Sequence, residues 1–141
     1  MKTIYFLSKA LFLLLLIGCS DGIGPKNGYG IVGEWRLFER GGSPGSGYYT
    51  EPVPANPLQS LTFTSDGQIY KVGDSKGALF YFFENANRFR VDSTEKGLLL
   101  WTKSKKKDKD ESYYHIKFQG DTLTLYPPCI EGCHFAFVKI R

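Results

Sequence analysis

The sequence predicts an all-β domain, a small up-and-down antiparallel β-barrel of about eight strands. Three observations lead to this fold class. Short segments alternate apolar and polar side chains, and Gly, Asn, Asp and Pro interrupt the chain every few residues. Aromatic residues make up 16% of the sequence, which suits a filled barrel interior. A β-sandwich is the alternative architecture, and helix is expected to be scarce.

The alternating segments predict which side chains face the core. Residues two apart along a strand share one face of the sheet, so each apolar set is expected to point inward. The inward sets are Trp35 and Leu37, Leu61 and Phe63, Tyr70 and Val72, Phe89 and Val91, Tyr114, Ile116 and Phe118, and Leu123 and Leu125. The run 135–141 is expected to be the closing strand. Two runs, 78–83 and 98–101, are apolar on both faces and are interpreted as strands covered on both sides.

Tight turns are expected where small residues separate these strands. Ser65-Asp66-Gly67, Lys96-Gly97 and Gly120-Asp121 contain residues that accept positive φ, which favours antiparallel hairpins. Two longer loops are expected at 41–57, rich in glycine and proline, and at 103–111, which is mostly charged. Long loops at a barrel mouth are a common place for binding residues.

The N-terminus has the order of an export signal. Lys2 and Lys9 precede the apolar run 10–17, which is shorter than the 20 or so residues of a membrane-spanning helix. The tetrapeptide Leu16-Ile17-Gly18-Cys19 resembles the lipobox of bacterial lipoproteins. That resemblance implies cleavage before Cys19 and attachment of a diacylglycerol to its thiol. The alternative is an ordinary secretory signal with an incidental cysteine.

This interpretation divides the chain into a signal peptide over 1–18, a flexible tether over 19–30 and one barrel domain over 31–141. Cleavage removes Lys2 and Lys9 and no acidic residue, so the formal net charge of +4 falls by two. The mature surface is therefore nearly balanced, and a nucleic acid partner is not expected.

Several segments resemble the lipocalin-like lipoproteins of Gram-negative bacteria, within the calycin type of barrels. They are Gly33-Glu34-Trp35-Arg36-Leu37, Leu61-Thr62-Phe63-Thr64-Ser65-Asp66-Gly67 and Cys129-Ile130-Glu131-Gly132-Cys133, followed by the aromatic last strand. The resemblance implies that Gly33 and Trp35 form the G-x-W element of the first strand, with the indole closing one end of the barrel. It also implies that Lys139 or Arg141 packs over the Trp35 ring.

Cys129 and Cys133 are expected to form a local disulfide. Three residues separate them in a chain that is expected to be exported, and oxidising compartments favour disulfides over metal or thiol chemistry. The alternative is a metal site that uses both thiols and His134, but the sequence offers no evident fourth ligand.

The sequence predicts no enzyme, no cofactor and no resident metal. No serine has a recognisable His and Asp partner, and no glycine-rich stretch leads into a phosphate-binding helix. The lysine-rich run 103–109 could bind a polyanion, but nearby acidic residues favour a solvated loop.

The predicted function is that of a monomeric binding protein anchored by lipid in the cell envelope, in the outer membrane. It is expected to hold a small hydrophobic or amphipathic ligand. The candidate ligand-binding residues are Tyr48, Tyr49, Tyr70, Phe82 and Tyr114. The alternative is a surface protein that binds another protein through its loops or outer face. A pocket of about 300 Å³ or more would favour the small ligand.

Overall fold

The computed structural model describes residues 29–73, 77–104, 111–130 and 132–141. The predicted signal peptide, Cys19, most of the tether and residues 105–110 of the charged loop lie outside the described residues. Within the described ranges the elements are β1 Gly33–Gly42, β2 Tyr49–Pro52, β3 Ser60–Phe63, β4 Ile69–Val72, α2 Ala78–Phe83, β5 Ala86–Thr94, β6 Gly97–Ser104, β7 Glu111–Gln119, β8 Thr122–Tyr126 and β9 Cys133–Lys139.

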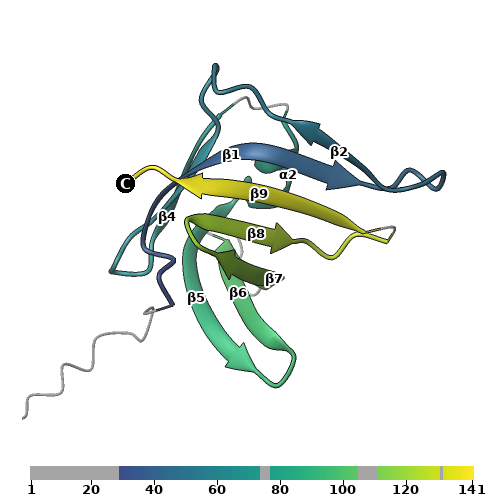
Figure 1. The fold of residues 1–141 in the computed structure, drawn as a ribbon. Coiled ribbons are helices and arrows are strands. Elements are labelled where there is room, and N and C mark those ends of the chain that lie inside the picture. The colour runs from purple at the N-terminus through teal and green to yellow at the C-terminus, as the bar shows by residue number, and fades with distance from the viewer. Residues whose placement is uncertain (1–28, 74–76, 105–110, 131) are drawn as a thin grey trace, which may run out of the picture.

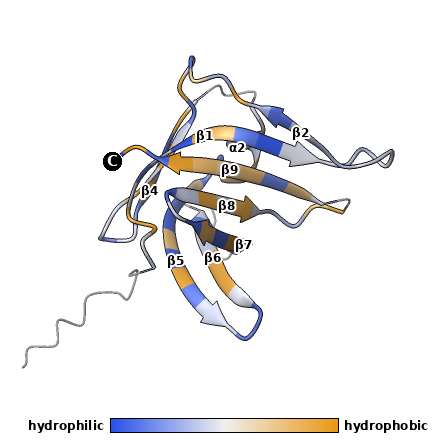
Figure 2. Ribbon diagram, in the orientation of Figure 1, coloured by the Kyte–Doolittle hydropathy of each residue, from blue (hydrophilic) through white to orange (hydrophobic). Residues whose placement is uncertain are grey.

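The strands form one antiparallel sheet that curls into a nearly closed barrel, so the predicted fold class is confirmed (Figure 1). The order of neighbours is β4-β3-β1-β9-β8-β7-β6-β5, and β2 pairs with β1 beside this path. Polar and apolar residues alternate along strands such as β5, which gives the sheet a buried inner face (Figure 2).

The barrel has one open seam, between β4 and β5. The two strands are joined there by an isolated bridge between Gln68 and Arg88. The Phe89 amide also donates a hydrogen bond to the Gly67 carbonyl at 2.9 Å. The aromatic edge contact of Phe63 with Phe89, 4.9 Å between ring centroids, packs the core behind the seam.

Trp35, near the start of β1, is buried inside the barrel. It is 2% exposed, and its indole nitrogen donates a hydrogen bond to the Ile31 carbonyl at 2.6 Å. The ammonium of Lys139 lies 5.4 Å from the indole centroid, whereas Arg141 forms an ion pair with Glu34 at 2.6 Å. Gly33 has a φ of 137°, and a Cβ there would lie 2.8 Å from the Lys139 side chain. A glycine therefore lets the last strand close over the indole.

The interpretation of residues 78–83 as a strand is wrong, because this run forms helix α2. A short run that is apolar on both faces has no periodicity to distinguish a buried strand from a buried helix. The helix sends Phe83 into the barrel, where its ring stacks on Tyr114 at 4.8 Å, and leaves Tyr81 81% exposed. The Lys71 ammonium donates to the Phe83 carbonyl at 2.6 Å and also contacts the Glu84 carbonyl, which satisfies acceptors at the helix end.

The predicted orientation of strand β4 is also wrong. Tyr70 and Val72 are 54% and 50% exposed, whereas Ile69 is 4% exposed. The alternation in this segment is ambiguous because Lys71 interrupts it with a long side chain. The apolar stem of a lysine can lie along a core while its ammonium reaches polar acceptors, as Lys71 does at α2.

Candidate functional site

A cleft opens at the end of the barrel opposite Trp35. There the β1–β2 turn and the connection from β8 to β9 lie side by side (Figure 1). Two adjoining hollows of about 370 Å³ and 440 Å³ share Gly42, Tyr49, Cys129 and Cys133 as walls. We call these two hollows together the mouth cleft. The first also contacts Arg40, Gly41, Glu51, Phe82 and Phe135, and the second Ser43, Pro44, Ile130 and Gly132.

The inner wall of the mouth cleft is aromatic. The rings of Phe82, from α2, and Phe135, from β9, meet edge to face with centroids 5.5 Å apart. Phe135 is buried in the core, while Tyr49 at the rim is 47% exposed. The helix that was not expected from the sequence therefore supplies one wall of the cleft and also fills the barrel beneath it.

A β-bulge in β1 determines which charged residue reaches the cleft. Trp35 and Leu37 point inward, but the pairing of β1 with β9 shifts between Leu37 and Glu39. Beyond the shift Arg40 lies opposite Phe135, and directly opposed residues of antiparallel strands share a face. The extra residue therefore turns Arg40 toward the mouth cleft and Glu39 toward the outer surface.

Arg40 is paired with Glu51 across the β1–β2 hairpin. Its Nε and Nη2 atoms donate to the same carboxylate oxygen at 3.0 Å and 2.8 Å. Both side chains are about half exposed, at 49% and 48%. An ion pair with this exposure contributes little to stability, about 0 to 1 kcal/mol. Exchange of the carboxylate for another anion is therefore energetically accessible.

Cys129 and Cys133 border the mouth cleft at disulfide-bonding distance, with Cα atoms 5.9 Å apart. The predicted pairing of these cysteines is confirmed at this level. A bridge across this short loop fixes the start of β9, which carries Phe135. The described loop residue Ile130 is fully exposed at the rim.

On the outer surface, His134 links β9 to the β1–β2 hairpin. Its Nε2 lies 3.0 Å from a carboxylate oxygen of Glu39, and its Nδ1 hydrogen-bonds the Tyr48 hydroxyl. The rings of Tyr48 and His134 stack at 5.8 Å. A Cβ on Gly41 would lie 2.6 Å from His134 Nδ1, so only glycine lets these rings cover β1.

This carboxylate, imidazole and phenol chain connects the β1–β2 hairpin to β9. Burial raises the pKa of the Tyr48 hydroxyl, and the nearby Tyr126 and Glu39 raise it further. The contact with His134 holds Tyr48 beside Tyr49, which lies at the cleft rim.

The structure brings together only some of the candidate ligand-binding residues. Tyr49 and Phe82 line the mouth cleft. Tyr114 lies beneath it, 2% exposed, and donates its hydroxyl to the Phe82 carbonyl at 2.8 Å. Tyr48 packs outside the hairpin, and Tyr70 lies on the outer face of β4, where it donates to Gln68 at 2.8 Å.

Arg40 and Glu51 were not predicted from the sequence as cleft residues. Strict alternation from Trp35 would place Arg40 on the outer face, and no residue in β1 signals the bulge. The only available signal was the glycine-rich loop that follows, because such loops often accompany irregular hairpins.

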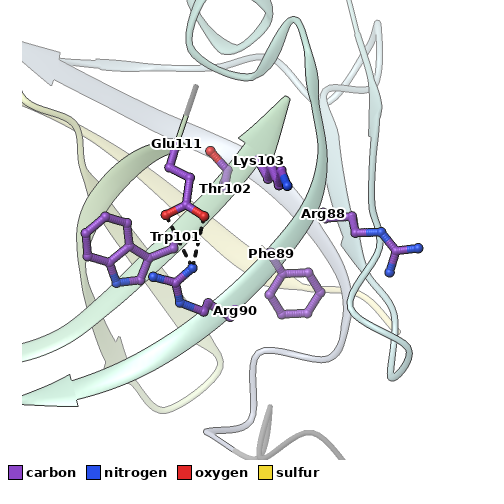
Figure 3. Close-up of a pocket in the computed structure, with 7 residues that line it drawn as sticks. All are labelled: Arg88, Phe89, Arg90, Trp101, Thr102, Lys103 and Glu111. Carbon is purple, nitrogen blue, oxygen red and sulfur yellow. Dashed lines mark hydrogen bonds and ion pairs between the residues drawn. The ribbon is translucent and has the colours of Figure 1, made fainter. Parts of the chain in front are cut away.

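A smaller hollow beside β5 and β6 is less suited to a small molecule (Figure 3). Its volume is about 130 Å³, well below the usual range for ligand pockets. Arg90 already lies 4.8 Å from the Trp101 ring centroid and 3.3 Å from a Glu111 oxygen. Figure 3 shows the guanidinium held between these two partners.

These features define the class of protein as a nearly closed, antiparallel all-β barrel compatible with a lipocalin-like fold. Comparison with models of protein families, with curated proteins and with solved structures found no match. Among the described residues, no helix has the length and apolar character needed to cross a membrane. The case for function therefore depends on the mouth cleft and the N-terminal sequence.

Proposed function

We propose that this chain is a lipocalin-like lipoprotein of the cell envelope, without enzymatic activity, that holds a small hydrophobic or amphipathic ligand. The observation that carries the proposal is the mouth cleft, which combines an aromatic wall with a single ion pair. Its volume exceeds the roughly 300 Å³ at which small-molecule pockets begin. Mostly apolar walls with few polar groups are typical of such pockets.

The lipid anchor is supported by the N-terminal sequence. The order of Lys2 and Lys9, the apolar run 10–17 and Cys19 is that of a lipoprotein signal. Two or more acyl chains would hold the mature chain stably on a membrane. We place it in the outer membrane.

Replacing Cys19 with alanine is expected to abolish labelling of the protein by a radioactive fatty acid, because no thiol remains to carry the diacylglycerol. Replacing Cys129 and Cys133 together by serine is the matched control, which should stay labelled. Equal labelling of the Cys19→Ala and parent chains would contradict the anchor.

Replacing Gly42 with tryptophan is expected to block the cleft. A Cβ at Gly42 would have its nearest neighbour, the Tyr49 hydroxyl, at 3.8 Å, so an indole can enter without strain in the backbone. Titration calorimetry with decanol measures the effect, on protein in nanodiscs and after subtraction of the heats from empty nanodiscs. The affinity of the Gly42→Trp variant for decanol should be at least tenfold lower than that of the parent protein.

Tyr70→Trp is the control, because it places an indole on an exposed position outside the cleft. Decanol binding that is unchanged by Gly42→Trp, or equally reduced by both variants, would contradict a ligand in the mouth cleft. Native mass spectrometry of protein taken from its own membrane would then identify any retained ligand.

A second candidate is that the rim binds another protein. Ile130 is fully exposed and Tyr81 is 81% exposed, and both lie near the mouth. Exposed tyrosine and isoleucine side chains are suitable anchors for a protein interface. A retained protein partner, with no small ligand, in the native mass spectrum would favour this function.

A further inference from the structure

We propose that the ligand has an anionic head, a carboxylate or a phosphate, and that Arg40 binds this head while the apolar part lies along Phe82 and Phe135. The inference deepens the proposed function and rests on it. Among the described residues that line the mouth cleft, Arg40 is the one cation and Glu51 the one anion. The head of an amphipathic ligand must therefore be recognised by one of these two side chains or by neutral groups.

Arg40 is the better fixed of the two. It lies on β1, with Glu51 of β2 opposite on one side and Phe135 of β9 opposite on the other. Glu51 lies on β2, a four-residue strand that is exposed throughout and pairs only with β1. A ligand can displace Glu51 with small changes at the edge of the sheet, whereas moving Arg40 would disturb the bulged strand.

The guanidinium also retains donors for a second anion. Arg40 donates through Nε and Nη2 to a single oxygen of Glu51. An arginine has five N–H donors arranged to grip a carboxylate or phosphate with two parallel hydrogen bonds. Glu51 does not make that two-oxygen contact, so an anionic head can bind beside it or replace it with a better geometry.

The apolar walls of the mouth cleft can bind the apolar part of the ligand. Phe82 and Phe135 lie in the same hollow as Arg40, and the Cys129–Cys133 pair continues the wall toward Ile130. An apolar ligand tail that starts at Arg40 and follows these groups buries apolar surface. Along this path it passes no further charged side chain among the described lining residues. The cleft therefore fits a molecule with one anionic end and one apolar end.

The test compares four ten-carbon probes that differ in the head: decanoate, decyl phosphate, decanol and decylammonium. Each is titrated by calorimetry into the full processed chain in nanodiscs, and heats from empty nanodiscs are subtracted. Decanoate and decyl phosphate are expected to bind at least about tenfold more tightly than decanol, as charge-assisted hydrogen bonds warrant. The two anions together show whether a carboxylate or a phosphate is preferred.

Arg40→Gln should reduce the affinity for both anions to about that for decanol, and continued binding of decanol by this variant shows that the cleft is intact. Glu51→Gln should maintain or strengthen binding of the anions. Arg88→Gln is the matched control, because Arg88 is an exposed arginine that lines the separate hollow beside β5 and β6. It should leave the preference for anions unchanged.

Three results would overturn the inference. The first is equal affinity for decanoate and decanol, and the second is a preference for the anionic probes that survives Arg40→Gln. The third is tightest binding of decylammonium, which would assign recognition of the head to Glu51. Decanol binding without any preference for a head would leave the proposed function intact. Absence of binding by all four probes would overturn both proposals.

Discussion

Replacing Trp35 with alanine is expected to lower the free energy of unfolding by about 3 to 5 kcal/mol. The indole is 2% exposed inside the barrel, so its removal leaves a cavity between Phe118 and the N-terminal segment. The Ile31 carbonyl also loses its 2.6 Å hydrogen bond from the indole. Chemical denaturation measures this loss, and heating should show a melting temperature lower by more than about 10 °C.

Lys139→Met measures the contribution of the cation to stability separately from that of the indole. The ammonium lies 5.4 Å from the Trp35 centroid, and such a contact contributes about 0.5 to 2 kcal/mol, less than the indole itself. A Trp35→Ala protein that melts within a degree or two of the parent would contradict the placement of Trp35 in the core.

Replacing Phe83 with alanine is expected to destabilise the protein by about 3 to 5 kcal/mol as well. Phe83 is 1% exposed and stacks on Tyr114 with an angle of 16° between the rings. Burial raises the pKa of the Tyr114 hydroxyl, which donates to the Phe82 carbonyl at 2.8 Å. The free energy of unfolding from urea denaturation measures the effect.

Tyr81→Ala is the matched control, because Tyr81 belongs to the same helix but is 81% exposed. It should change the free energy of unfolding by no more than about 0.5 kcal/mol. Equal effects of the two substitutions would show that α2 does not fill the barrel. The cavity left in Phe83→Ala is apolar and should bind benzene, which the parent protein should not.

Residues with strong local patterns were predictable from the sequence. Strict alternation placed Trp35, Leu61 and Phe63 inside, and each is at most 2% exposed. Turn residues and the spacing of strands predicted antiparallel pairing, which is confirmed. The pairing of Cys129 with Cys133 was predictable because the two are close in sequence and no other partner is required.

Residues that form the candidate site depend instead on contacts between distant segments. Arg40 lies opposite Phe135, which is far away in the sequence, and α2 fills the barrel because Phe83 stacks on Tyr114 and Lys71 donates to the Phe83 carbonyl. A local sequence pattern does not reveal either contact, because each forms only when the sheet has curled into a barrel.

The sequence by itself determined an antiparallel β-barrel with Trp35 on its inner face, because a period of two selects which face each side chain occupies. Only the tertiary structure decided which residues enter the mouth cleft. One extra residue in β1 reverses the alternation and turns Arg40 inward, and the register with β9 fixes where that reversal occurs.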